Sequence, residues 1–348
     1  MRDLPCGDLR IYLDFELRRV DCRSCGSVKR ERLDWLSANP HYTKRFARYV
    51  GKQCRSAPIK EVADDLRLDW HAVKEMEKLY MMEQLSLSGE PRPAVIGIDE
   101  ISVRQGHAYR IVVSDLERHQ PIWFGGADRS EESMALFYTF LGAERSKEIR
   151  LAVMEMWKPF RNGTEAHAPH AAILYDKFHV LRHLNEAMDQ VRKAEYKRLT
   201  NRADRKYIKG QKYVLLSHRE NLSPEKRRAL KTLLAANQRL NTAYVLNEQF
   251  AQVWDYRSEP WARKFFDQWR RSLRCQRLKP FEKFAELVAR HWDGIAAYCQ
   301  PENKVALGFV EGLNNKIRVI QRRCYGLRDE DYLHLKILTC TLPPLPRT

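Results

Sequence analysis

Four segments of the chain have the composition of buried structure, and each contains an acidic residue. The segments are AVIGIDEISV (94–103), LAVMEMW (151–157), AILYDKFHV (172–180) and FVEGLNNKI (309–317), and the acids are Asp99, Glu155, Asp176 and Glu311. A buried carboxylate without a partner is costly, so each must accept hydrogen bonds or bind a cation. The chain is therefore constrained to a fold that gathers acids on its strands and on one late helix.

The pattern of residues 94–199 predicts an α/β fold. Three short β runs come first, followed by a helix, a strand, a helix or loop, a strand and a long helix. The strands are expected at 94–103, 109–116, 120–125, 149–156 and 171–176, and the helices at 130–142 and 179–199. An antiparallel run followed by strands alternating with helices predicts a mixed sheet. From about 186 to 304 the pattern is almost entirely helical.

Another helix is predicted over 309–324. Its apolar residues follow 3-4-3-4 spacing and would face the core: Val310, Leu313, Ile317, Ile320 and Cys324. Glu311, Asn315, Arg318 and Arg322 would lie on the adjacent stripe. Carboxylate oxygens are the ligands that Mg²⁺ prefers, and two such ions can serve phosphoryl transfer. The acids thus suit a metal site beside a phosphate path.

The charge of the chain points to a polyanionic partner. It has 348 residues, with 62 Lys and Arg against 45 acids and a net charge of +17. Such an excess is usually matched by nucleic acid, although a basic protein without that role is the alternative. No apolar run is long enough to span a membrane, and no signal peptide is evident. The eight cysteines are scattered, which fits a reducing cytoplasm.

The first 35 residues suggest part of a zinc ribbon. Residues 9–20 alternate apolar and charged residues, which predicts a half-exposed strand. Cys22 and Cys25 follow in a knuckle that could offer two thiolates to Zn²⁺. A second such pair is absent, and Cys6 and Cys54 are poorly spaced substitutes. The alternative is a β-turn with two idle thiols.

Residues 42–82 are helical in pattern, and 59–79 resemble a helix-turn-helix. Asp69 is a good N-cap for the second helix, and Arg67 stands where the turn often has glycine. The exposed face of that helix would point to a DNA major groove with Trp70, His71, Lys74 and Lys78. A plain helical hairpin is the alternative. Residues 85–93 have the composition of a linker.

The four acidic segments, taken in order, resemble the bacterial insertion-sequence transposases of the ISL-three family. The motifs are VIGIDEIS, RLAVMEMWKPFR, ILYDKFHVLRH and FVEGLNNKIRVIQRRCYG. The resemblance implies a ribonuclease-H-like catalytic fold with an Asp-Asp-Glu site and a helical insertion. The implied parts are a partial zinc ribbon (1–35), a helix-turn-helix domain (36–84), a catalytic domain (94–185 plus 305–340) and the insertion (186–304).

The resemblance also implies the roles of site residues. Asp99 and Glu311 match the first and last acids of the family, and the middle acid is either Glu155 or Asp176. In the first case Asp176 and His179 match an Asp-x-x-His motif of related transposases and would support or orient the site. Glu155 stands where the family usually has aspartate, and a misplaced metal ligand can lower the rate about 10²-fold. The first cysteine pair of the family's ribbon is also missing, so the chain could begin downstream of the ancestral start.

The function implied is DNA transposition. The enzyme would bind terminal inverted repeats, then cleave and join strands with Mg²⁺ or Mn²⁺, while Zn²⁺ is a further candidate for the cysteines. Near the acids, the cations expected to hold double-stranded DNA are Lys316, Arg318, Arg322 and Arg323. Two ends must be brought together, which favours a homodimer or larger assembly associated with the bacterial nucleoid. The alternatives are an impaired or repurposed copy that only binds DNA, and a different ribonuclease-H-like nuclease.

Overall fold

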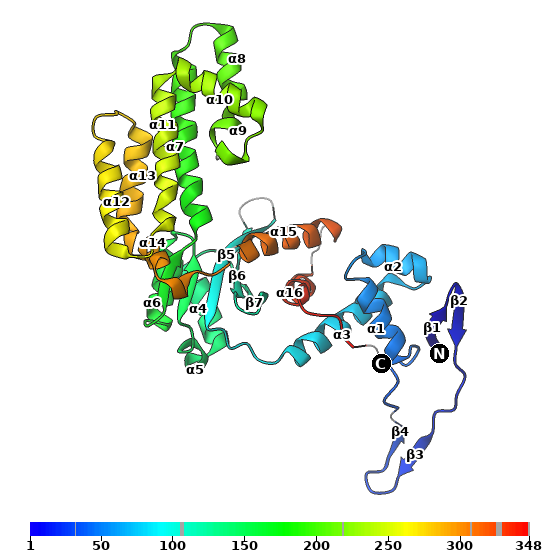
Figure 1. The fold of residues 1–348 in the computed structure, drawn as a ribbon. Coiled ribbons are helices and arrows are strands. Elements are labelled where there is room, and N and C mark those ends of the chain that lie inside the picture. The colour runs from blue at the N-terminus through cyan, green and yellow to red at the C-terminus, as the bar shows by residue number, and fades with distance from the viewer. Residues whose placement is uncertain (32, 105–107, 218, 307, 325–328, 347–348) are drawn as a thin grey trace.

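The computed structural model describes residues 1–31, 33–104, 108–217, 219–306, 308–324 and 329–346. Along the chain it has N-terminal strands, three helices, a sheet with its covering helices, a helical arm, and two C-terminal helices that return to the sheet (Figure 1). Among the described residues, no helix is both long and apolar enough to cross a membrane.

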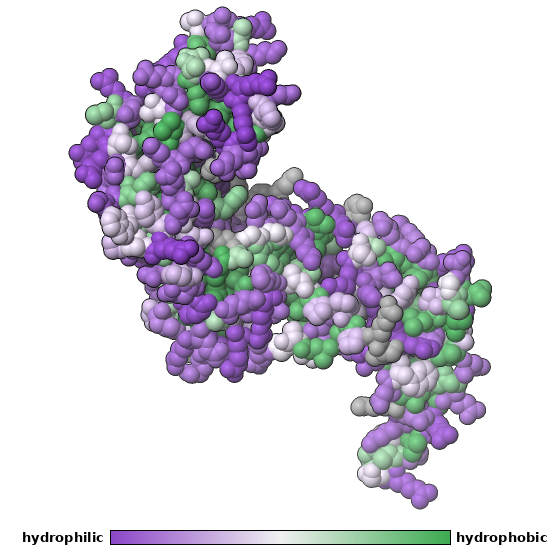
Figure 2. Space-filling view, in the orientation of Figure 1, coloured by the Kyte–Doolittle hydropathy of each residue, from purple (hydrophilic) through white to green (hydrophobic). Residues whose placement is uncertain are grey.

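The N-terminal strands form two small hairpins. β1 (Arg2–Cys6) pairs with β2 (Leu9–Tyr12), and β3 (Arg19–Cys22) pairs with β4 (Ser27–Arg30). The single strand predicted over 9–20 is therefore wrong in part, because residues 13–18 are not a strand. Hydrophobic residues remain on the surface of these hairpins, as Figure 2 shows. They include Leu9, Tyr12, Val20 and Val28.

The three helices that follow form a small core of their own. They are α1 (Lys44–Gln53), α2 (Ile59–Leu66) and α3 (Trp70–Ser88). Arg67 adopts the left-handed conformation in the turn between α2 and α3, and the Asp69 side chain accepts hydrogen bonds from the backbone of His71 and Ala72. The predicted helix-turn-helix geometry is present. The expected linker at 85–93 is shorter, because α3 continues through its first four residues.

The central sheet has five strands in the order β7-β6-β5-β8-β9. β5 (Val95–Arg104), β6 (Ala108–Asp115) and β7 (Gln120–Gly125) are antiparallel, whereas β8 (Leu151–Met154) and β9 (Ala172–Tyr175) run parallel to β5. The mixed sheet predicted from sequence is confirmed. The connection expected at 105–107 lies outside the described residues.

Helices cover both faces of this sheet. One face packs against α4 (Glu131–Leu141), α6 (Lys158–His167) and the start of α7 (Lys177–Arg198). The short α5 (Ala143–Ser146) leads from α4 towards β8. The other face packs against α15 (Gly308–Arg323) and α16 (Glu330–Thr339) through Leu313, Ile317, Leu333 and Ile337. Alternate residues of β5 thus face two different sets of helices.

The helical arm lies between β9 and α15 in sequence and extends away from the sheet (Figure 1). Its hydrophobic residues belong to the same core cluster as the α4 face of the sheet. After α7 its helices are α8 (Arg202–Gly210), α9 (Lys212–Leu215), α10 (Pro224–Ala236), α11 (Gln238–Ala251), α12 (Glu259–Ser272), α13 (Lys279–Arg290) and α14 (Trp292–Ala296). Short 3-10 turns lie at Arg219–Asn221, Gln252–Asp255, Ala297–Cys299 and Pro301–Asn303.

The C-terminal segment ties the sheet to the N-terminal helices. α16 packs on β7 with one side and on α3 with another. After α16, the backbone of residues 342–345 is bonded to that N-terminal region: Leu342 O accepts from Arg55, Pro343 O accepts from Gln84, and Leu345 N donates to Tyr80. The last helix and the tail therefore connect the two parts of the chain.

Candidate functional site

The strand register places three of the predicted acids in adjacent positions. Ile98 of β5 pairs with Met154 of β8, and Met154 pairs with Tyr175 of β9. Asp99, Glu155 and Asp176 are each the next residue along, so they lie level at one edge of three neighbouring strands. Because strands are about 4.8 Å apart, the outer two backbones are separated by roughly 10 Å. Glu155 and Asp176 follow their strands rather than interrupting them.

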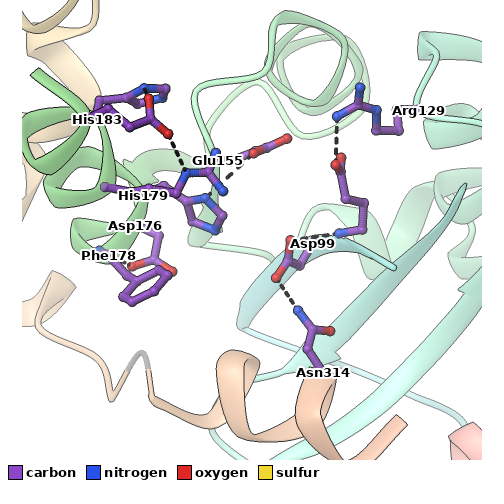
Figure 3. A network of polar contacts seen from close by, with 11 residues as sticks. Asp99, Arg129, Glu155, Asp176, Phe178, His179, His183 and Asn314 are labelled. Atoms are coloured by element: carbon purple, nitrogen blue, oxygen red, sulfur yellow. Dashed lines mark hydrogen bonds and ion pairs between the residues drawn. The ribbon is translucent and has the colours of Figure 1, made fainter. Parts of the chain in front are cut away.

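Asp99 faces α15. Its Oδ1 accepts a hydrogen bond from the backbone N–H of Glu100 at 2.8 Å, and its Oδ2 accepts one from Asn314 Nδ2 at 2.5 Å (Figure 3). Burial raises the pKa of Asp99, and the charge of Glu155 raises it further, although these hydrogen bonds and His179 oppose the rise. Asn314 thus connects the first predicted acid to the helix that carries the last one.

Glu100 is a member of the acid cluster that the sequence argument did not predict. It points to the opposite face of β5, where its Oε1 lies 2.6 Å from the guanidinium of Arg129. Burial and the nearby Glu155 raise the pKa of Glu100 to about 7, despite this ion pair. Arg129 also stacks over Trp157, whose indole N–H donates to the Arg129 carbonyl at 2.9 Å.

Glu155 is close to both Asp99 and Glu100, and its charge raises the pKa of each. Its Oε2 is 3.6 Å from His179 Nδ1, and both side chains are about one-seventh exposed. The separation is too long for a good hydrogen bond, and His179 Nδ1 is buried without a hydrogen-bond partner. His179 is on the first turn of α7, so the helix brings the histidine of the ILYDKFHVLRH motif close to the acid of the RLAVMEMWKPFR motif.

Asp176 caps α7, where its side chain accepts a hydrogen bond from the Phe178 backbone at 2.8 Å. Burial raises the pKa of Asp176, and the charge of Glu311 adds to the rise. Glu311 itself is exposed in the first turn of α15. The four predicted acids are therefore coupled in pairs. The charge of Glu155 raises the pKa of Asp99, and the charge of Glu311 raises the pKa of Asp176.

These side chains are near one another without forming a cage. Within the described residues, no group of three or more His, Cys, Asp or Glu side chains is arranged to hold a metal ion. Two oxygens at the site, Glu100 Oε2 and Asn314 Oδ1, are nevertheless buried without a hydrogen-bond partner. An unsatisfied buried acceptor is unfavourable unless a donor or a cation reaches it.

The predicted DNA-contacting residues of α3 fall into two classes. Trp70 and His71 are exposed at its start. Lys74 and Lys78, in contrast, face Asp329 at the N-terminus of α16, with Nζ–Oδ2 distances of 2.7 and 3.4 Å. The sequence argument placed both lysines on a free surface, and this is wrong because α16 packs there.

The cations of α15 lie on two different sides of the helix. Lys316 and Arg323 line a cavity that faces the N-terminal helices. Arg318 and Arg322 are exposed, and Arg318 donates a hydrogen bond to Asn315. The helix therefore presents positive charge in two directions.

The structure gives no support to the zinc site. The thiol of Cys22 contacts Ser24 at 3.1 Å, and that of Cys25 contacts Ser27 at 2.9 Å. Cys54 is buried in the core of the N-terminal helices, and Cys6 is exposed. Cys22 is the last residue of β3, and Cys25 lies in the turn before β4.

Comparison with known proteins decides the family. Residues 96–337 match a family model described as transposase, and residues 31–80 match the helix-turn-helix domain of transposase family ISL3. The chain belongs to the ISL3 transposases. The expected family is confirmed, and membership implies a DNA-binding enzyme of the nuclease and transferase type, a class that generally uses divalent metal ions.

Two relatives show how far this ISL3 transposase resembles others. It is 33% identical over 339 residues to the transposase for insertion sequence element IS1001 of Bordetella parapertussis, covering 97% of this chain and 83% of the relative. It is 24% identical over 356 residues to the transposase for IS1557 of Mycobacterium tuberculosis, covering 95% and 79%.

Proposed function

We propose that this ISL3 transposase binds the terminal inverted repeats of an insertion sequence and catalyses Mg²⁺-dependent strand cleavage and strand transfer. The observation that carries the proposal is the convergence at one edge of the sheet. Acids at the same level of β5, β8 and β9 lie there, and α15 is attached to the first of them by the hydrogen bond from Asn314 to Asp99.

The sheet supports a ribonuclease-H-like assignment for the catalytic part. Three antiparallel strands are followed by two parallel ones on the other side of β5, with helices on both faces. This is the arrangement expected from the resemblance. We propose that 94–185 and 305–340 form this domain, and that 186–304 is inserted into it.

The donor chemistry of the site suits a hard divalent cation. The available ligands are carboxylate and amide oxygens, and burial together with neighbouring acids raises the pKa of Asp99, Glu100 and Asp176. A divalent cation would relieve this repulsion. We propose Asp99, Glu311 and one of Glu155 and Asp176 as ligands. When bound, the metal would stabilise charge on the attacking and leaving oxygens of a phosphodiester.

The protein's own residues would hold the substrate. Trp70 and His71 are exposed for contact with a groove of the end DNA, and Arg318 and Arg322 are exposed for contact with phosphates near the acids. His179 would orient Glu155. A water molecule would attack the phosphorus of a phosphodiester in line, which breaks the P–O3′ bond and releases a 3′-hydroxyl. That 3′-hydroxyl would then attack a phosphodiester of the target strand in line and displace its 3′-oxygen. Two copies of the chain are expected, because two transposon ends must be joined.

Glu311→Ala tests the proposal. The exposed position predicts a folded variant that still binds end DNA but loses Mg²⁺-dependent nicking, as measured by gel shift and by cleavage of labelled DNA. Glu225→Ala, which removes another exposed first-turn glutamate on α10, should behave as wild type. Retained nicking by Glu311→Ala would contradict the assignment.

The middle acid can be identified by a second pair of variants. If Glu155 is the ligand, Glu155→Asp shortens a side chain and changes the rate, whereas Asp176→Asn retains activity. If Asp176 is the ligand, Asp176→Asn loses activity and Glu155→Asp leaves the rate unchanged. Circular dichroism must accompany both, because Asp176 also caps α7.

A second function is favoured by one observation. Glu155 stands where the family usually has aspartate, which suits a catalytically impaired copy that only binds its own repeats. Specific binding of end DNA without cleavage in either Mg²⁺ or Mn²⁺ would favour this alternative.

A further inference from the structure

A cavity of about 310 Å³ separates the N-terminal helices from the last two helices of the chain. One wall comes from α1, α3 and the residue Arg55, and the other from α15 and α16. Its charged lining residues are Arg55, Glu77, Lys316, Arg323 and Lys336. Four cations and one acid thus surround a small space between the two parts of the chain, and we call this space the junction cleft.

The acid among these lining residues, Glu77, already has two hydrogen-bond partners. Glu77 is buried, and its Oε1 accepts a hydrogen bond from Lys336 Nζ at 2.7 Å while its Oε2 accepts one from the hydroxyl of Tyr332. Among the described ion pairs, none involves Lys316 or Arg323. Arg55 donates to the backbone carbonyl of Leu342, which carries no net charge. The cleft therefore has an excess of positive charge.

Cations from both walls line the same cavity, Arg55 on one side and Lys316 and Arg323 on the other. Burial raises the pKa of Cys340 to about 11, and the positive charges of Lys316 and Arg55 act to lower it. One of these cations is on α15 and the other follows α1, and both are near the same thiol. Charges that converge from two walls on one space suit an anion between them.

The walls are held in place before any ligand arrives. The Glu77 network joins α3 to α16, and the tail is bonded to Arg55, Gln84 and Tyr80. Fixing the backbones that carry the cations avoids part of the entropy that binding would otherwise cost. The cleft is therefore preorganised.

We propose that the junction cleft binds a backbone phosphate of the end DNA, on the path from the helix-turn-helix to the acids. This inference rests on the proposed function. Arginine and lysine are the usual partners of phosphate. Lys316 and Asn314, which contacts Asp99, are both on α15, so the cleft and the acidic site lie on different sides of the same helix. Arg318 and Arg322 face elsewhere.

The double variant Lys316→Gln/Arg323→Gln tests the inference. Each lost phosphate contact makes the slope of log K against log salt less negative by about 1. Fluorescence anisotropy with end DNA should therefore show a slope reduced by about 1 to 2. Arg55→Gln, from the opposite wall, should reduce it in the same direction. The charge-matched control is Lys226→Gln/Arg228→Gln, two exposed residues of α10, which should leave the slope unchanged.

Ethylation interference identifies the phosphate directly. In the wild type, ethylation of one or two phosphates should block binding, and these positions should no longer matter in Lys316→Gln/Arg323→Gln. If the wild type shows no preference for end DNA, the proposed function itself fails. If the wild type prefers end DNA but the cleft variants match the α10 control in slope and interference pattern, the cleft assignment alone is overturned.

Discussion

Glu77→Ala should loosen the connection between the N-terminal helices and the rest of the chain. The carboxylate is buried between α3 and α16 and accepts hydrogen bonds from Tyr332 and Lys336. The Lys336 side chain is only 13% exposed. Removal of Glu77 leaves a nearly buried ammonium and a buried hydroxyl without their partner. Breaking a buried pair in this way typically costs about 3–5 kcal/mol.

Hydrogen exchange measures this effect locally. The chain has several parts, so a single unfolding free energy for the whole protein is poorly defined. For amides of α16 that exchange by local opening, 3–5 kcal/mol corresponds to a roughly 10²- to 10³-fold or greater loss of protection. The strands β8 and β9 do not contact this network and should keep their protection.

A double variant gives the control. Glu77→Leu/Lys336→Met removes both charges and fills the space with apolar groups, which is often neutral or even stabilising. It should recover most of the protection that Glu77→Ala loses. Equal protection in wild type and Glu77→Ala, or no recovery in the double variant, would refute the argument that this pair holds the junction.

Three other variants test separate features. Asp3→Asn removes an acid whose pKa is lowered to about 2, chiefly by the hydrogen bond from Arg45. A lowered pKa stabilises the fold above about pH 4, and this contribution is lost as the pH falls towards 2. The variant should therefore melt at a lower temperature than wild type at pH 7, and the two melting temperatures should converge near pH 2. Gly294→Ala would place a Cβ against the ring of buried Tyr175, so hydrogen exchange of β9 and α14 amides should show a local loss of about 1–3 kcal/mol from overpacking, and unchanged protection would contradict the contact. Asn314→Asp sets a second carboxylate against Asp99, so its melting temperature should fall without metal and rise more than that of wild type when Mg²⁺ is added; equal shifts would count against a cation at this position.

The elements of this fold were predictable wherever local pattern decides structure. Asp69 was expected to cap α3 and does so, and Val310, Leu313 and Ile317 were expected to be buried on α15 and are. The strand predicted over 9–20 failed because alternation alone does not show where a strand loses its pairing partner.

The site was predicted less completely than the fold. The acids Asp99, Glu155, Asp176 and Glu311 stay predictions as ligands, while Glu100 and Asn314 were missed. A signal for Asn314 existed, since it is four residues after Val310 and three before Ile317 and so belongs to the edge of the buried stripe. The partnership of Glu100 with Arg129 depends on residues 29 positions apart, which no local pattern contains.

The pairing of Lys74 with Asp329 spans 255 residues. Helical spacing correctly placed this lysine away from the core of its own three helices. It could not show that a helix near the C-terminus would cover that surface.

The helical arm leaves the sheet directly after Asp176 and returns directly before the helix that carries Glu311. Two of the candidate acids, Asp176 and Glu311, are thus close to the two connections between the arm and the sheet domain. A force applied to the far end of the arm, for example by a second copy of the chain, would change the spacing between these two carboxylates. A deletion at the far end of the arm should therefore reduce activity far less than a change of length next to Asp176 or Glu311.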